Sequence, residues 1–161
     1  MPQAFADMTA DPNQDVITVA TSRFGEMAVN PDKIITMTTP LLGFPTARQF
    51  VLKPHGEESP FLWLQALEDP QLAFVVIQAA VLFPEYRPFI PENVRRELEA
   101  DGEERLEILL ILTIPAANPQ KMTANLLGPL AVNGRKRLAR QILQDPAVYD
   151  SCWPVFAEEV E

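Results

Sequence analysis

The sequence contains few of the residues on which metal binding, disulfide bonding and most catalysis depend. Its single cysteine, Cys152, has no partner for an internal disulfide, which is typical of a protein from a reducing compartment. Its single histidine, His55, cannot form a usual zinc site with one cysteine, because such sites take several ligands of these types. The six glycines are scattered singly, so none belongs to a phosphate-binding loop. We expect no metal and no cofactor.

Long apolar runs are also missing. No stretch approaches the roughly 20 apolar residues that cross a bilayer, and residues 1–7 lack the basic and apolar regions of a signal peptide. The length of 161 residues suits one domain. We therefore expect a soluble, cytoplasmic, single-domain protein without a membrane partner.

Positive charge is scarce. The formal net charge at pH 7 is −9, and residues 57–107 hold twelve acidic residues against four arginines, which gives that stretch a charge of −8. Because phosphate backbones bind through lysine and arginine, this negative field argues against nucleic acid as a ligand. It suits a basic protein partner, although a solvated acidic face that maintains solubility explains the same charge.

Sixteen prolines are present, and they divide the chain into short segments. Proline ends helices and is excluded from central strands, so the elements between prolines must be short. Many of these segments are β-branched or alternate between apolar and polar residues, as strands do. We expect strands over residues 16–21, 33–38, 48–53, 129–133 and 138–143, with a further short strand ending at residue 29. This pattern predicts a mainly β protein, an antiparallel barrel or sandwich.

The clearest pair of strands spans residues 61–66 and 72–77, joined by the turn Glu68-Asp69-Pro70. The first strand alternates, and the second is apolar on both faces, so we predict an antiparallel hairpin whose second strand is central. We interpret Trp63 as a packing residue of this hairpin. The turn must project from the sheet, where its two carboxylates would meet a basic partner, although turns also favour Asp and Pro for geometry alone.

One helix is predicted over residues 91–100, where Pro91 can occupy the first position and Gly102 can end it. Residues 106–114 are ambiguous. A resemblance to a capping box favours a helix, whereas the β-branched residues favour a buried strand, which we prefer. Residues 1–14 and 145–161 carry little periodic pattern, so we expect a flexible N-terminal segment, a β domain over residues 15–144 and a flexible C-terminal tail.

No constellation of residues predicts catalysis. His55 lies in an evident loop, and the adjacent carboxylate pairs would point to opposite faces of extended chain. The basic cluster Arg135, Lys136, Arg137 and Arg140 is the one feature that could contact RNA. It lacks interleaved aromatic residues for base stacking and is also typical of a charged edge strand. We therefore predict that the protein is not an enzyme.

Several separate blocks, in order from about residue 16 to residue 143, resemble the flagellar assembly factor FliW family. They are Phe24-Gly25-Glu26, Asp32-Lys33-Ile34-Ile35, Gly43-Phe44, Pro60-Phe61-Leu62-Trp63-Leu64-Gln65, Glu68-Asp69-Pro70, Leu72-Ala73-Phe74-Val75-Val76, Phe83-Pro84-Glu85-Tyr86, Thr113-Ile114-Pro115, Met122-Thr123-Ala124-Asn125-Leu126 and the spacing Asn133, Arg137, Gln141. The loop Thr39-Pro40-Leu41-Leu42 differs from the Glu-Gly-Leu-Pro that the family favours. The residues around Cys152 also depart from the family's usual ending.

The resemblance implies a small antiparallel β-barrel-like single domain with one or two short helices. It further implies a cytoplasmic protein, expected to be monomeric, that binds flagellin and the basic, RNA-binding translational regulator CsrA. Binding CsrA would relieve repression of flagellin synthesis, and free flagellin would compete for the factor. The alternative is an RNA-binding β-barrel that uses residues 135–140. The candidate partner-binding residues are Phe44, Glu68, Asp69, Pro84, Tyr86, Met122 and Asn125.

Overall fold

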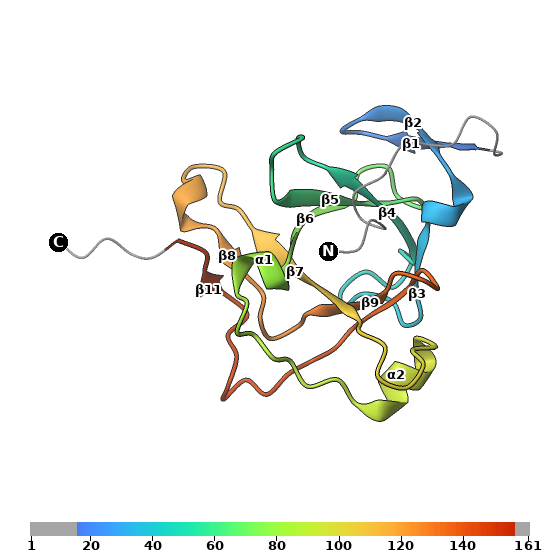
Figure 1. Cartoon of the computed structure of the whole chain (residues 1–161). Helices are drawn as coiled ribbons and strands as arrows, with labels where there is room; N and C mark the ends of the chain where they lie inside the picture. Colours follow the sequence, from blue (N-terminus) through green and yellow to red (C-terminus); the bar gives the residue numbers. More distant parts are fainter. Residues whose placement is uncertain (1–15, 157–161) are drawn as a thin grey trace.

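The computed structural model describes residues 16–156, and seven of its strands close into a barrel (Figure 1). The barrel strands are β3 (Ile35–Met37), β4 (Gln49–Pro54), β5 (Phe61–Ala66), β6 (Ala73–Gln78), β7 (Glu107–Thr113), β9 (Leu130–Asn133) and β10 (Leu138–Gln141). The order around the barrel is β3-β4-β5-β6-β7-β9-β10, and β10 returns to pair with β3. The prediction of a mainly β, barrel-like domain is confirmed.

One pair of barrel strands, β10 and β3, is parallel, while the other neighbours are antiparallel. Strand directions cannot alternate all the way around a ring with an odd number of members. A seven-stranded barrel must therefore contain at least one parallel pair, and the expectation of a wholly antiparallel sheet is corrected on this point. The parallel pair lies where the last hairpin closes onto the first barrel strand.

The barrel interior is filled by alternate residues of each strand, because successive side chains of a strand point to opposite faces. Leu52, Leu64, Val76 and Leu109 belong to this interior cluster, and each is at most 2% exposed. Burying a side chain of this kind stabilises the fold by about 1.5–3 kcal/mol. The β-branched and leucine-rich segments of the sequence therefore become the walls of the barrel.

Three groups of elements cover the outside of the barrel (Figure 1). A hairpin of β1 (Ile17–Thr21) and β2 (Gly25–Val29) packs Val19 and Val29 on Val51 of β4. The short helix α2 (Glu92–Glu97) packs against β9 and the residues that follow β10. The helix α1 (Ala79–Leu82) and the two-residue strands β8 (Thr123–Ala124) and β11 (Trp153–Pro154) lie by β6 and β7.

The packed structure continues beyond the domain end predicted at residue 144. Strand β11 pairs with β8, and the ring centroid of Trp153 lies 5.1 Å from that of Phe83. No periodic pattern marks this segment, because its contacts come from single side chains and a two-residue strand. The segment predicted to be flexible at the N-terminus lies outside the described residues, as do residues 157–161.

Candidate partner-binding surface

The turn between β5 and β6 is exposed and carries the two predicted carboxylates, Glu68 and Asp69. The Glu68 carboxylate accepts hydrogen bonds at 3.1–3.3 Å from the backbone N–H groups of Arg48 and Gln49, where β4 begins. Asp69 Oδ1 accepts a hydrogen bond of 2.9 Å from the backbone N–H of Gln71. Both acids therefore shape the turn, and both still expose their charge to solvent.

Below this turn lies Gln65, a fully buried polar side chain whose role the sequence did not reveal. Its Nε2 lies 3.0–3.4 Å from the carbonyl oxygens of Ala66, Asp69, Pro70 and Leu72, which share its two N–H donors. A buried amide that satisfies backbone carbonyls fixes the path of the chain around it. Gln65 thus determines where the turn presents Glu68 and Asp69.

The loop between β3 and β4, residues 38–48, lies at the same end of the barrel as this turn. Phe44 packs edge-on against Phe74 of β6, with ring centroids 5.1 Å apart. Leu42 is 61% exposed, and its backbone N–H donates to Gln141 Oε1 at 3.3 Å. The loop therefore holds apolar side chains toward solvent on a backbone that is fastened to β10.

A polar network around Gly128 joins this loop to the segment after β8. Gln141 Nε2 donates to the Gly128 carbonyl oxygen at 3.1 Å, and the Gly128 N–H donates to Asn125 Oδ1 at 2.8 Å. A Cβ atom at position 128 would lie 2.7 Å from Gln141 Nε2 and 3.2 Å from Asn125 Nδ2, so only glycine fits without a shift. Asn125 is therefore connected, through Gly128 and Gln141, to the loop between β3 and β4.

Three of the seven candidate residues, Phe44, Glu68 and Asp69, lie in the loop and the turn at this end of the barrel, which we call the loop end. A fourth, Asn125, is connected to it through Gly128 and Gln141. Leu42 belongs to the same surface and was missed, because a lone leucine in a proline-rich loop gives no signal in the sequence. The combination of exposed apolar side chains and exposed carboxylates suits a partner surface with apolar and basic groups.

The remaining three candidates lie elsewhere. Tyr86 and Met122 are buried, at 5% and 7% exposed, in the cluster between β7 and the C-terminal segment. The Tyr86 hydroxyl donates to the Leu126 carbonyl oxygen at 2.5 Å, and burial raises the pKa of this tyrosine above its ordinary value. Pro84 is exposed nearby, and its carbonyl oxygen accepts a hydrogen bond from Arg87. The buried pair can influence a partner only by positioning the surface around it.

The basic cluster at residues 135–140 is bound to acidic side chains around α2. Arg135 contacts Asp101 at 3.1 Å and Glu104 at 2.9 Å. The hydrogen bond from Arg135 lowers the pKa of Glu104 below its ordinary value. Two more ion pairs, Lys136–Glu99 and Arg140–Glu97, complete the arrangement. Part of the acidic stretch predicted from the sequence is therefore neutralised within the molecule.

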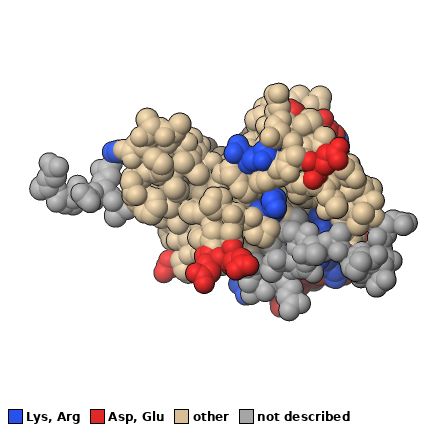
Figure 2. All heavy atoms as spheres, turned by 90° about the horizontal axis from the view of Figure 1, so that it is seen from above, with Lys and Arg blue, Asp and Glu red and all other residues tan. Residues whose placement is uncertain are grey.

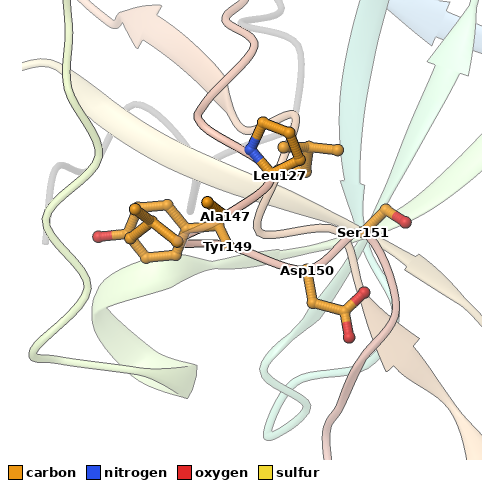
Figure 3. Close-up of a pocket in the computed structure, with 7 residues that line it drawn as sticks. Leu127, Ala147, Tyr149, Asp150 and Ser151 are labelled. Atoms are coloured by element: carbon orange, nitrogen blue, oxygen red, sulfur yellow. The ribbon is translucent and has the colours of Figure 1, made fainter.

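A shallow hollow of about 410 Å³ lies beside the segment 145–151 and is lined in part by Leu127, Tyr149, Asp150 and Ser151 (Figure 3). The Asp150 carboxylate accepts the backbone N–H of Cys152 at 2.8 Å, so it is occupied as a turn acceptor. The Tyr149 ring and the Asp150 side chain point away from each other in Figure 3. The hollow pairs no nucleophile with a base and carries no predicted chemistry.

Within residues 16–156, no group of three or more histidine, cysteine, aspartate or glutamate side chains could hold a metal ion. In the same part of the chain, no helix is long and apolar enough to cross a membrane.

Comparison with known proteins identifies the family. The model of the family described as FliW protein matches residues 18–155, from β1 to β11. The chain belongs to the FliW family. The flagellar assembly factor FliW of Magnetococcus marinus is 38% identical over 122 residues, which cover 76% of this chain and 75% of that protein. The FliW protein of Geobacter sulfurreducens is 36% identical over 140 residues, which cover 87% of each chain.

A crystal structure of the flagellar assembly factor FliW has the same fold, with a TM-score of 0.79 and 30% sequence identity. The match covers 89% of this chain and 100% of that one, so the barrel and its outer elements are shared. Flagellar assembly factors of the FliW family are non-catalytic, as the sequence predicted for this protein.

Proposed function

We propose that this FliW-family protein works in the cytoplasm by binding flagellin and by antagonising the translational regulator CsrA. Free flagellin would compete for the protein, release CsrA and so limit its own synthesis. The flagellar role is supported by the family match over residues 18–155. The whole cycle consists of binding equilibria and needs no catalytic group.

The loop end is the surface that we assign to CsrA. The observation that carries this assignment is the exposed pair Glu68 and Asp69, whose turn is hydrogen-bonded to Arg48 and Gln49 at the end of the loop that exposes Leu42. A basic partner would be steered by the carboxylates and held by apolar contacts next to them. Because Gln65 and the Gly128 network fix the backbone here, the surface would change little on binding.

The alternative, an RNA-binding barrel, finds less support. Its candidate cations Arg135, Lys136 and Arg140 each contact at least one acidic side chain. Phosphate binding would have to break these ion pairs, and the net charge of −9 would oppose the approach of RNA.

Calorimetric titration of the purified protein with flagellin, with CsrA and with flagellin leader RNA tests the proposal. We expect saturable binding of each protein and no binding of RNA alone. Binding of RNA without CsrA would favour the alternative. Failure of both proteins to bind at micromolar concentrations would reject the proposed function.

A further inference from the structure

A cluster of cations and aromatic rings lies where the tip of the β1–β2 hairpin meets the end of β4 and strand β5. The Arg23 guanidinium carbon lies 4.1 Å from the ring centroid of Trp63, and Lys53 Nζ lies 5.2 Å from that of Phe24. The Phe24 and Trp63 rings meet edge-on at 5.9 Å, and the His55 ring lies 6.2 Å from Trp63. We call these five residues the cation–aromatic cluster.

The cations of this cluster differ from those at residues 135–140. Among the described residues, neither Arg23 nor Lys53 contacts a carboxylate, whereas the other cluster is bound to acidic side chains. Arg23 is exposed, and Trp63 is half-buried. Figure 2 views the molecule from above and shows both basic and acidic side chains on that face. Cations stacked on rings keep their charge available to an anion.

Beside Arg23 lies a hollow of about 210 Å³, lined by residues of the hairpin tip and of β5, the turn and β6: Ser22, Arg23, Gln65, Pro70, Gln71 and Ala73. Gln65 Oε1 is buried and has no hydrogen-bond partner within residues 16–156, although the Nε2 of the same amide is fully used. The hollow adjoins both the Arg23 guanidinium and the residues that form the turn.

We propose that the cation–aromatic cluster and the adjoining hollow bind an extended acidic segment of flagellin. Carboxylates of that segment pair with Arg23 and Lys53, and the segment continues into the hollow beside Arg23. This inference rests on the proposed function, because it gives each proposed partner its own contacts. The hollow is lined by Pro70 and Gln71, which follow Glu68 and Asp69 in the chain, so a flagellin segment in the hollow would hinder CsrA at the turn and compete with it. The basic partner takes the acidic loop end, and the cluster of opposite sign falls to flagellin.

The observations favour a peptide over a nucleic acid, although both could stack on Trp63. The cluster offers two lysine or arginine side chains, too few to offset the net charge of −9. A peptide supplies carboxylates for both cations without a phosphate backbone that the net charge would repel.

The test is a charge reversal, Arg23→Glu with Lys53→Glu, measured by calorimetric titration with purified flagellin and with CsrA. We expect flagellin affinity to fall at least about tenfold and CsrA affinity to stay within about twofold. The matched control is Arg96→Glu with Lys121→Glu, which makes the same change in net charge at exposed side chains that form no ion pair within residues 16–156. It should leave flagellin affinity unchanged.

Thermal melting checks that each variant folds. If the Arg23→Glu, Lys53→Glu protein does not fold, Arg23→Gln with Lys53→Gln is measured in its place. Flagellin affinity within twofold of the parent would overturn the inference while leaving the proposed function intact. Equal losses in the variant and its control would also overturn it. A parent protein that binds single-stranded RNA, and a variant that does not, would assign the cluster to nucleic acid. A parent that fails to bind flagellin would reject both proposals.

Discussion

Individual polar side chains hold the loop end together, and Gly128 is the position with the least room. A Cβ atom at Gly128 would lie 2.7 Å from Gln141 Nε2, so Gly128→Ala should displace that amide and loosen its bond to Leu42. We expect a loss of about 1–3 kcal/mol in the free energy of unfolding, measured by urea denaturation. Gly56→Ala is the matched control, because its Cβ would meet only Ser59 at 3.9 Å. A Gly128→Ala protein as stable as the control would contradict the packing described for this network.

A second prediction at this scale concerns Glu97, whose pKa is lowered by hydrogen bonds from Thr38 and Arg140. A carboxyl group whose pKa is lower in the folded than in the unfolded chain stabilises the fold at pH values above its ordinary pKa. This stabilisation is lost as the pH falls through the folded-state pKa. Glu97→Gln should therefore destabilise the protein more at about pH 7 than at about pH 3. Denaturant titrations at both pH values measure this difference. If Glu97→Gln lowered the free energy of unfolding equally at both pH values, the charge of Glu97 would have no part in holding α2 to β10.

At the scale of elements, the chain after β10 is part of the packed structure. Trp153 packs its ring against Phe83 and pairs with Ala124 across β8 and β11. Trp153→Ala should lower the free energy of unfolding by about 2–3 kcal/mol, less than the ~3–5 kcal/mol of a fully buried tryptophan. Val148→Ala, at a side chain that is 66% exposed in the same segment, should change it by less than about 0.5 kcal/mol. Equal stability of the two variants would mean that the segment does not support the fold.

The elements that the sequence predicted well are those with strong periodic or β-branched patterns. The β5–β6 hairpin matches its prediction, and residues 106–114 form β7 as the β-branched residues indicated. The predicted helix over 91–100 is shorter, ending at Glu97, because Glu99 adopts a left-handed conformation with φ of 57°. The two-residue strands β8 and β11 have no sequence pattern, since tertiary contacts alone define them.

The candidate site was harder to predict than the fold. Glu68 and Asp69 were found because a turn between two apolar strands must be exposed. Gln65 and Gln141 were not, because a glutamine in a strand has no pattern that reveals which backbone groups it will meet. Tyr86 and Met122 were expected at the surface from the resemblance alone, and the structure buries both. A sequence motif can show that a residue is important, but it does not show whether the residue contacts a partner or supports the surface from inside.

At the scale of the whole molecule, the charge is divided between surfaces. Removing the two charges of the turn tests whether the loop end steers a basic partner. Glu68→Gln with Asp69→Asn keeps acceptors for the N–H groups of Arg48, Gln49 and Gln71 and leaves the apolar contacts in place. We expect slower CsrA association and a weaker dependence of the rate on salt, with a melting temperature close to the parent's. Stopped-flow mixing at two salt concentrations measures both, and unchanged rates with an unchanged salt dependence would remove the turn from the CsrA surface.

The most direct test of the account measures the switch itself. CsrA is first bound to labelled flagellin leader RNA, and the FliW-family protein is added in increasing amounts while the fluorescence anisotropy of the RNA is followed. Flagellin is added last. We expect release of the RNA by the parent protein, a several-fold weaker response from Glu68→Gln with Asp69→Asn, and rebinding of the RNA once flagellin is present. RNA that stays bound to CsrA at saturating protein, or that is released and does not rebind when flagellin is added, would contradict it.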